Sequence, residues 1–141
     1  MLAIAVLPAA LTQTFGRMIG RRRDGWVLFG VMAVLFIAGL VLCDWAEQAG
    51  SRRFAQAGNV DQSVSTLQSG GNMEGKEARF GIAGSVLTAI TTSNGATGSY
   101  NSMHDSYTPL GGMIPLVNML LGEVIFGGLG TGLYRASFWW R

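Results

Sequence analysis

An uninterrupted apolar run, WVLFGVMAVLFIAGLVLC at residues 26–43, decides the fold of this chain. Its 18 residues carry no charge, and as a helix they would extend about 27 Å. The hydrocarbon core of a bilayer is about 30 Å thick, so the run is long enough to cross it. Charged residues bound the run on both sides, at 21–24 before it and at Asp44 and Glu47 after it. The sequence therefore predicts a transmembrane helix, which we assign to residues 26–44.

The composition of the 141-residue chain agrees with a membrane protein. Charged residues make up 13% and hydrophobic residues 49%, whereas soluble proteins carry roughly 25% charged residues. So little charge excludes a disordered, solvated chain. The 21 glycines follow no collagen period, and the single cysteine, Cys43, excludes an internal disulfide and a cysteine-based zinc site. A net charge of +2 gives no reason to expect nucleic acid as a partner.

The segments on either side of the predicted helix differ in charge. Residues 1–25 begin with eleven apolar residues and end in an arginine-rich stretch. We expect the end of a preceding transmembrane helix there, followed by a connection that its arginines hold in the cytoplasm. Residues 45–79 hold most of the remaining charges and follow the helix on the side opposite the arginines, so we expect a periplasmic loop. Its charged stretch 73–77 is expected to be solvated and to lie against the outer mouth of the protein.

A second, shorter apolar run, FGIAGSVLTAITT at residues 80–92, would form a helix of only about 20 Å, too short to cross a bilayer. We interpret it as a re-entrant pore helix, followed by a small, polar, glycine-containing loop at 93–106. Residues 108–134 contain one charge, two prolines and seven glycines, and predict an interrupted transmembrane helix. The expected fold is an all-α membrane protein with a span–pore-helix–span repeat and an extracytoplasmic loop.

This arrangement is typical of cation channels, in which backbone carbonyls of a re-entrant loop replace the water shell of the ion. Neither Lys, Arg, Asp nor Glu occurs from Phe80 to His104. Two segments of the loop have the small residues that such a filter needs, namely Ser93-Asn94-Gly95 and Thr97-Gly98-Ser99. The residues alone leave both alternatives open.

Four long motifs carry a resemblance to a known family. The sequences GGNMEGKEARFGI (70–82), NSMHDSYTPLGGMIPL (101–116) and NMLLGEVIFGGLGTGLY (118–134) resemble the potassium-binding A subunit of the Kdp-type potassium-transporting ATPase. The N-terminal LPAALTQTFGRMIGRRRDGW (7–26) resembles the cytoplasmic connection before the third repeat of that family. The motifs occur in the family's order, and the resemblance runs from about Leu7 to Tyr134, nearly the whole chain.

The resemblance implies a function and a set of partners. This chain would be the third of four span–pore–span repeats (residues 26–134) in the channel-like, potassium-binding and translocating subunit of an ATP-driven, high-affinity uptake pump. Such a multi-pass subunit lies in the inner membrane of bacteria or archaea, in contact with the lipid bilayer. Its partners are a P-type ATPase B subunit that hydrolyses ATP, a small C subunit and an F peptide. The chain itself has no ATP-binding motif, and we expect it neither to bind ATP nor to be an enzyme by itself.

The resemblance also implies roles for individual residues. The spacing to the MHDS motif favours Thr97, Gly98 and Ser99 as the filter, with potassium held by the carbonyls of Thr97 and Gly98. It implies that His104 and Asp105 brace the filter. The family's gating or ion-path residues correspond to Glu123, Gly127 and Gly128, in the interrupted helix.

The chain departs from the family at its end and in its length. Residues 135–141, RASFWWR, do not resemble the family and are expected to be an unrelated tail. One repeat cannot surround an ion, so we expect a truncated fragment that is inactive alone. The alternative function is a non-transporting membrane scaffold or assembly segment.

Overall fold

The computed structural model describes residues 2–51, 61–67, 69–95, 97–122 and 124–126. This part of the chain is helical, and its single β pairing is an isolated antiparallel bridge between Lys76 and Ser102. The elements are α1 (Leu2–Met18), α2 (Arg22–Gln48), α4 (Gly81–Asn94), the short 3-10 helix η1 (His104–Ser106) and α5 (Pro109–Leu120).

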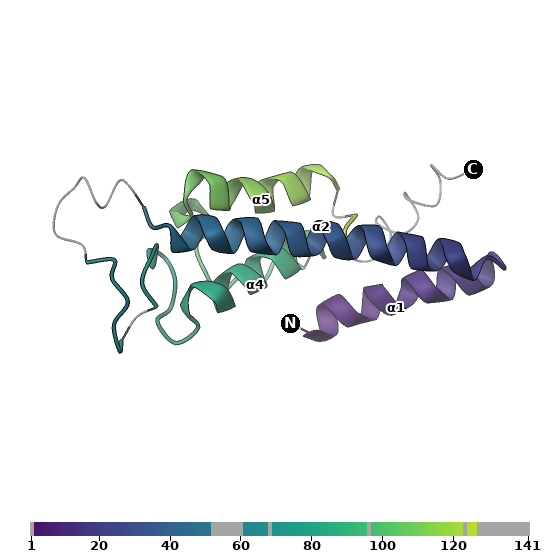
Figure 1. Cartoon of the computed structure of the whole chain (residues 1–141), viewed down its shortest axis with the longest axis horizontal. Helices are drawn as coiled ribbons and strands as arrows, with labels where there is room; N and C mark the ends of the chain where they lie inside the picture. Colours follow the sequence, from purple (N-terminus) through teal and green to yellow (C-terminus); the bar gives the residue numbers. More distant parts are fainter. Residues whose placement is uncertain (1, 52–60, 68, 96, 123, 127–141) are drawn as a thin grey trace.

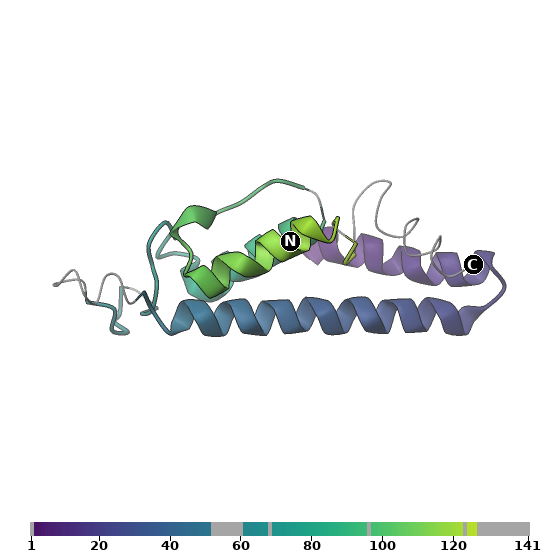
Figure 2. The same ribbon diagram turned by 90° about the horizontal axis from the view of Figure 1, so that it is seen from above.

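Helix α2 is the element against which α1, α4 and α5 all pack. With 27 residues it is about 40 Å long, and it is long and apolar enough to cross a membrane. It extends beyond the predicted 26–44 at both ends, over residues 22–25 and 45–48. In Figures 1 and 2, α1 lies against the first half of α2, while α4 and α5 lie against the second half. Figure 2 shows all three on one side of α2, and many apolar side chains of α2 are exposed.

The hairpin of α1 and α2 is held by close backbone contact. A Cβ atom on Gly25 would lie 2.8 Å from the carbonyl oxygen of Thr12, and one on Gly16 would lie 3.0 Å from the Cα of Gly25. Thr12 is fully buried at this crossing. Small residues let helix backbones approach each other closely in membrane proteins. The glycines therefore allow the two helices to touch where any side chain would separate them.

Helix α4 is short, and its second half is almost wholly buried between α2 and α5. Its apolar residues Ile82, Val86, Ala89 and Ile90 form the core together with Cys43 of α2 and a tyrosine after η1. Its buried hydroxyls donate to carbonyls in the preceding turn, as Thr92 Oγ1 does to Thr88 O at 2.7 Å. Such bonds satisfy polar groups inside a helix. They allow polar residues to stay buried in a helix that continues to Asn94, two residues beyond the expected end at 92.

The chain reverses after Gly95, and residues 97–103, the return segment, run back toward the end at which α4 began (Figure 2). The return segment ends on the loop before α4, where Met103 N donates to Gly75 O at 3.1 Å. Helix α5 then begins at Pro109, with Thr108 as its N-cap. A helix that enters and an irregular segment that returns therefore lie on one flank of α2.

The interrupted helix expected at 108–134 is described only to residue 126. Helix α5 ends at Leu120, and Gly122 follows with a φ of +73°, a conformation that suits glycine. The ring of Phe126 then lies 5.8 Å from that of Phe29 and 6.1 Å from that of Phe36, between centroids. The chain thus breaks after α5 and turns back onto α2.

Candidate ion-binding loop

The return segment carries the filter residues that the family resemblance favours, namely Thr97, Gly98 and Ser99. All three residues are exposed. Within the described ranges, no hydrogen bond involves their backbone carbonyls. Gly98 has a φ of +63°, and a Cβ atom placed on it would meet no heavy atom within 4 Å. The three carbonyls are therefore available to a ligand, and the glycine is required by backbone conformation rather than by crowding.

The alternative filter, Ser93, Asn94 and Gly95, lies at the C-terminal end of α4. Ser93 and Asn94 have helical backbone, and Gly95 is the C-cap. Ser93 Oγ donates to Ile90 O at 3.2 Å and accepts a bond from Asn118 Nδ2 of α5 at 3.1 Å. The side-chain amide of Asn94 is buried, without a partner in the part of the chain that the structure describes. These residues join α4 to α5 and carry the partial negative charge of a helix C-terminus.

His104 and Asp105, the two residues expected to brace the filter, have different surroundings in the structure. The ring of His104 is 4.0 Å from the ring of Tyr100 and 5.5 Å from that of Tyr107, between centroids. Burial lowers the pKa of His104, so the neutral imidazole is favoured. The side chain of Asp105 is exposed. The histidine thus contacts the return segment through Tyr100, while the aspartate faces outward.

A network that the sequence did not reveal lies beside the loop, around Glu47 in the last turn of α2. Glu47 is fully buried. Its Oε1 accepts hydrogen bonds from the backbone N (2.8 Å) and Oγ1 (2.7 Å) of Thr108. Its Oε2 accepts from Nδ2 of Asn72 (2.8 Å) and Nζ of Lys76 (2.7 Å). The carboxylate also fills the space that a side chain at Gly111 would need.

Lys76 corrects one expectation from the sequence. The stretch 73–77 was expected to be solvated, and Glu74 and Glu77 are exposed. The side chain of Lys76, however, is fully buried in its ion pair with Glu47. Its Nζ also lies 4.2 Å from the centroid of the Tyr107 ring. A buried ammonium requires such partners, because desolvation of an unpaired charge is costly.

The sequence offered one weak signal for this network. Glu47 follows Cys43 by four residues, so both side chains lie on the same face of a helix. The apolar run ends at Cys43, however, and an acid just beyond it is read as a flanking charge. Its partner Lys76 lies 29 residues away in sequence. Only the path of the intervening loop brings the two charges together.

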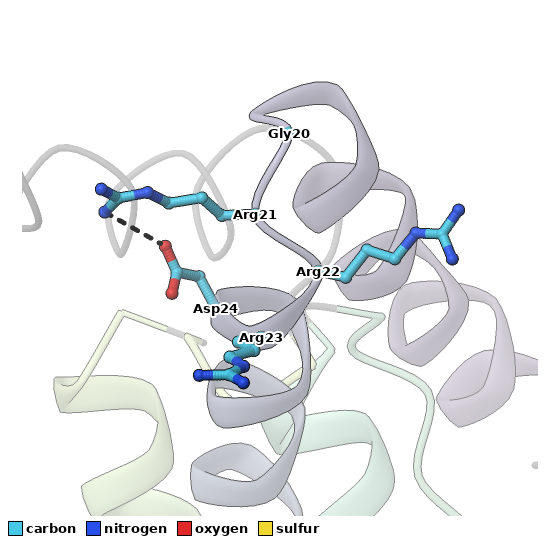
Figure 3. A pocket seen from close by; sticks show the side chains of 5 residues that line it. All are labelled: Gly20, Arg21, Arg22, Arg23 and Asp24. Atoms are coloured by element: carbon cyan, nitrogen blue, oxygen red, sulfur yellow. Dashed lines mark ion pairs between the residues drawn. The ribbon is translucent and has the colours of Figure 1, made fainter.

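The arginines that served to predict orientation do not form a convergent site. Figure 3 shows Arg21 turned toward Asp24, with 4.0 Å between Arg21 Nη1 and Asp24 Oδ2, while Arg22 points away on the other side of the chain. Residues 21–23 are all exposed. The residues predicted for gating, Glu123, Gly127 and Gly128, lie outside the described residues.

The fold and the loop define a class of protein: a helical chain organised around one apolar helix of membrane length, with a polar, glycine-containing loop folded against it. Among the described residues, no cluster of three or more His, Cys, Asp or Glu could hold a metal ion. The backbone carbonyls of Thr97, Gly98 and Ser99 are oxygen atoms of the described loop that make no hydrogen bond there.

The chain belongs to the family described as KdpA, Potassium-transporting ATPase A subunit, which it matches over residues 1–139, so the match extends into the segment 135–141 that was expected to be an unrelated tail. It is similar to proteins named potassium-transporting ATPase potassium-binding subunit. It is 58% identical to the one from Sorangium cellulosum (strain So ce56), 56% identical to that of Janthinobacterium sp. (strain Marseille) and 52% identical to that of Koribacter versatilis (strain Ellin345). Each match covers 134 residues, 95% of this chain.

The chain spans only 22–23% of the length of these relatives. A subunit of a potassium transporter is located in a membrane, and the length and composition of α2 agree with that location.

Proposed function

We propose that this chain supplies one span–pore-helix–span repeat of the potassium-binding, translocating subunit of an ATP-driven potassium uptake pump. The observation that carries the proposal is the return segment. Directly after the C-terminal end of α4, the carbonyls of Thr97, Gly98 and Ser99 make no hydrogen bond among the described residues. Carbonyls left free in this way can replace the hydration shell of a potassium ion.

The electrostatics around the loop favour a cation. The C-terminal end of α4 carries a partial negative charge, and residues 80–103 contain no charged side chain that would repel or trap an ion. The free carbonyls add further negative ends of dipoles. A monovalent cation is therefore stabilised without a carboxylate, which allows it to leave again as well as to enter.

Thr97-Gly98-Ser99 is the better of the two filter candidates. Ser93 and Asn94 belong to helix α4, and the Ser93 hydroxyl already bonds with Ile90 and Asn118. Gly98, in contrast, has left-handed backbone in a non-helical segment, whose carbonyls at 97–99 make no hydrogen bond among the described residues.

The wider arrangement follows the family. We propose that residues 26–44, within α2, form the first span and that residues 80–92, nearly all in α4, form the pore helix. Residues 93–106 would be the filter loop and 108–134 the second, interrupted span. The arginines of residues 1–25 would face the cytoplasm, and loop 45–79 the periplasm. Glu123, Gly127 and Gly128 would serve gating or the ion path. The partners would be the ATP-hydrolysing B subunit, the C subunit and the F peptide, in a bacterial or archaeal inner membrane.

The test uses a full-length subunit. The potassium-binding subunit of Sorangium cellulosum carries this chain in place of its matching segment and is expressed with its pump partners in a host without other potassium uptake. Gly98→Ala is compared with Gly20→Ala. Both glycines have positive φ, +63° and +76°, and a Cβ atom on either would meet nothing within 4 Å. The backbone strain, about 1–2 kcal/mol, is therefore matched between the two variants.

We expect Gly98→Ala to weaken apparent potassium affinity by about tenfold or more, because carbonyl positions change, while Gly20→Ala stays close to the parent. Thr97→Ala serves as a second variant in the same loop. Equal growth of all variants at limiting potassium would contradict the filter role. It would favour the alternative, a scaffold segment that does not transport.

A further inference from the structure

The network around Glu47 is connected to the return segment by two routes. Lys76 pairs with Ser102 through the backbone bridge, and Met103 N donates to Gly75 O at 3.1 Å. In addition, the Ser102 hydroxyl shares a 2.7 Å hydrogen bond with the hydroxyl of Tyr107. The ring of Tyr107 lies under the Lys76 ammonium. The far end of the return segment is therefore fixed to the Glu47–Lys76 pair.

The same pair also fixes the start of α5. Thr108 caps the helix by accepting a bond from Gly111 N at 3.1 Å, and its own N and Oγ1 donate to Glu47. Asn72 bonds Glu47 through Nδ2, which also donates to Ser106 O at 2.9 Å. A negative charge at a helix N-terminus is stabilising. One carboxylate of α2 thus holds the loop before α4, the residues after the return segment and the first turn of α5.

The return segment itself has little internal support. Its first residues follow α4, a well-packed helix, and its last residues, Ser102 and Met103, are tied to the network. Between these anchors, no hydrogen bond among the described residues holds the carbonyls of residues 97–99. Their positions are consequently set by the two ends and by the ring contact of Tyr100 with His104, and displacement of the anchored end moves them.

We propose that Glu47 and Lys76 are positioning residues that set the geometry of the carbonyls at Thr97–Ser99. The inference rests on the proposed function, since it concerns the ion that those carbonyls would bind. Carbonyl sites discriminate between ions through the number and position of their ligands. A loop with one released anchor should therefore bind potassium more weakly and distinguish it less well from rubidium and sodium.

The experiment uses the same chimeric subunit in its assembled pump, with ATPase activity measured against potassium, rubidium and sodium. The variants are Glu47→Gln, Lys76→Met and the double variant. The control is Glu77→Gln, which removes a carboxylate from the same loop. Glu77 pairs with Arg79 at 2.9 Å, but both side chains are more than half exposed. The control thus removes an ion pair that solvent screens.

We expect each single variant to raise the potassium concentration for half-maximal activity about tenfold. Discrimination against rubidium and sodium should fall, with a smaller change in maximal rate. The double variant should recover part of the loss, because it leaves no unpaired buried charge. Glu77→Gln should match the parent. Variants that lose maximal rate in proportion to the amount assembled, with unchanged half-maximal concentration and ion preference, would overturn the inference and leave a purely structural role.

Tyr107→Phe keeps the test decisive if the charge variants fail to assemble. It removes the hydrogen bond to Ser102 but leaves no unpaired charge, and it should shift potassium affinity and ion preference in the same direction by a smaller factor. Unchanged affinity and preference in Tyr107→Phe would overturn the inference.

Gly98→Ala is measured alongside. If Gly98→Ala matches Gly20→Ala, the proposed function fails and this inference with it. If Gly98→Ala weakens potassium affinity while the network variants do not, only the positioning role fails.

Discussion

The two ends of α2 are held to their neighbours by opposite means. At the Gln48 end, a buried carboxylate joins three segments through short, charged hydrogen bonds. At the Arg22 end, Gly25 touches the backbone of α1 with no side chain between them. The hydrogen bonds at the Gln48 end fix the orientation of the segments that they join, because each bond has a preferred geometry. The glycine contact at the Arg22 end fixes only the distance between α1 and α2. The loop that we propose to bind an ion lies beside the half of α2 where hydrogen bonds fix the orientation of the neighbouring segments.

We expect the largest loss of stability when the network around Glu47, at the Gln48 end of α2, is disrupted. Glu47→Ala leaves Lys76 buried and unpaired, and we expect a loss of about 3–5 kcal/mol in the free energy of unfolding. Denaturant titration of the chain in detergent micelles measures this loss. The single cysteine gives a second reading, because Cys43 is fully buried one turn before Glu47 and its thiol donates to Gly111 O at 3.4 Å. Its alkylation should become faster.

The matched control is Glu77→Ala, which removes a carboxylate from an exposed pair. It should change stability by less than about 1 kcal/mol and leave the alkylation of Cys43 unchanged. Equal losses of stability in the two variants would mean that the buried ion pair stabilises the chain no more than the exposed pair does.

The variant Gly25→Ala disrupts the close contact between α1 and α2. The new Cβ atom would lie 2.8 Å from the carbonyl oxygen of Thr12, so the helices must separate. We expect a loss of about 1–3 kcal/mol, as for other overpacked sites. Gly30→Ala in the same helix is the control, since its Cβ atom would meet nothing within 4 Å. It should stabilise the chain by up to about 1 kcal/mol through helix propensity. A stabilising Gly25→Ala would contradict the close crossing.

A double-mutant cycle sharpens the comparison at the junction of α4 and α5. Asn118 Nδ2 donates to Ser93 Oγ at 3.1 Å, a neutral bond between buried groups. Asn118→Ala and Ser93→Ala should each cost about 1 kcal/mol, with a coupling of about 0.5–1.5 kcal/mol between them. Zero coupling would show that the neutral bond does not join the helices. The coupling of Glu47 with Lys76, measured in the same way, should be clearly larger.

The smallest effect is a pH dependence that arises beside the charged end. Burial lowers the pKa of His104 in the folded chain, so the unfolded chain takes up the proton first, near its ordinary value of about 6.5. Stability should therefore decrease as pH falls from 7.5 to 5.5. The melting temperature of His104→Asn should decline less over that range. Identical slopes would exclude a contribution of His104.

Periodicity and length were enough to predict the helices, because α2 and α4 are apolar runs of very different length. The small, polar residues at 93–106 were enough to predict a loop, whereas its role as an ion filter rests on the family resemblance and stays a prediction. Neither predicted the position of Lys76, which reads as one charge among several at 73–77 and is buried only because the loop passes over the end of α2. The extension of α4 to Asn94 was missed because its hydroxyls bond within the helix, which a polarity pattern reads as a loop. Long-range pairing of charges depends on the path of the chain, and local sequence does not record it.

The pairing of Lys76 with Ser102 has a consequence for how this fold can change over time. It brings together the two ends of the stretch 77–101, which contains α4 and the proposed filter residues. A stretch whose ends already meet can be exchanged as a cassette, since closing it again costs little chain entropy. New filter sequences could thus be grafted between fixed ends while α2, α5 and the α4 residues that pack against them are kept. The bridge would then be the natural boundary for recombination in the laboratory and in evolution.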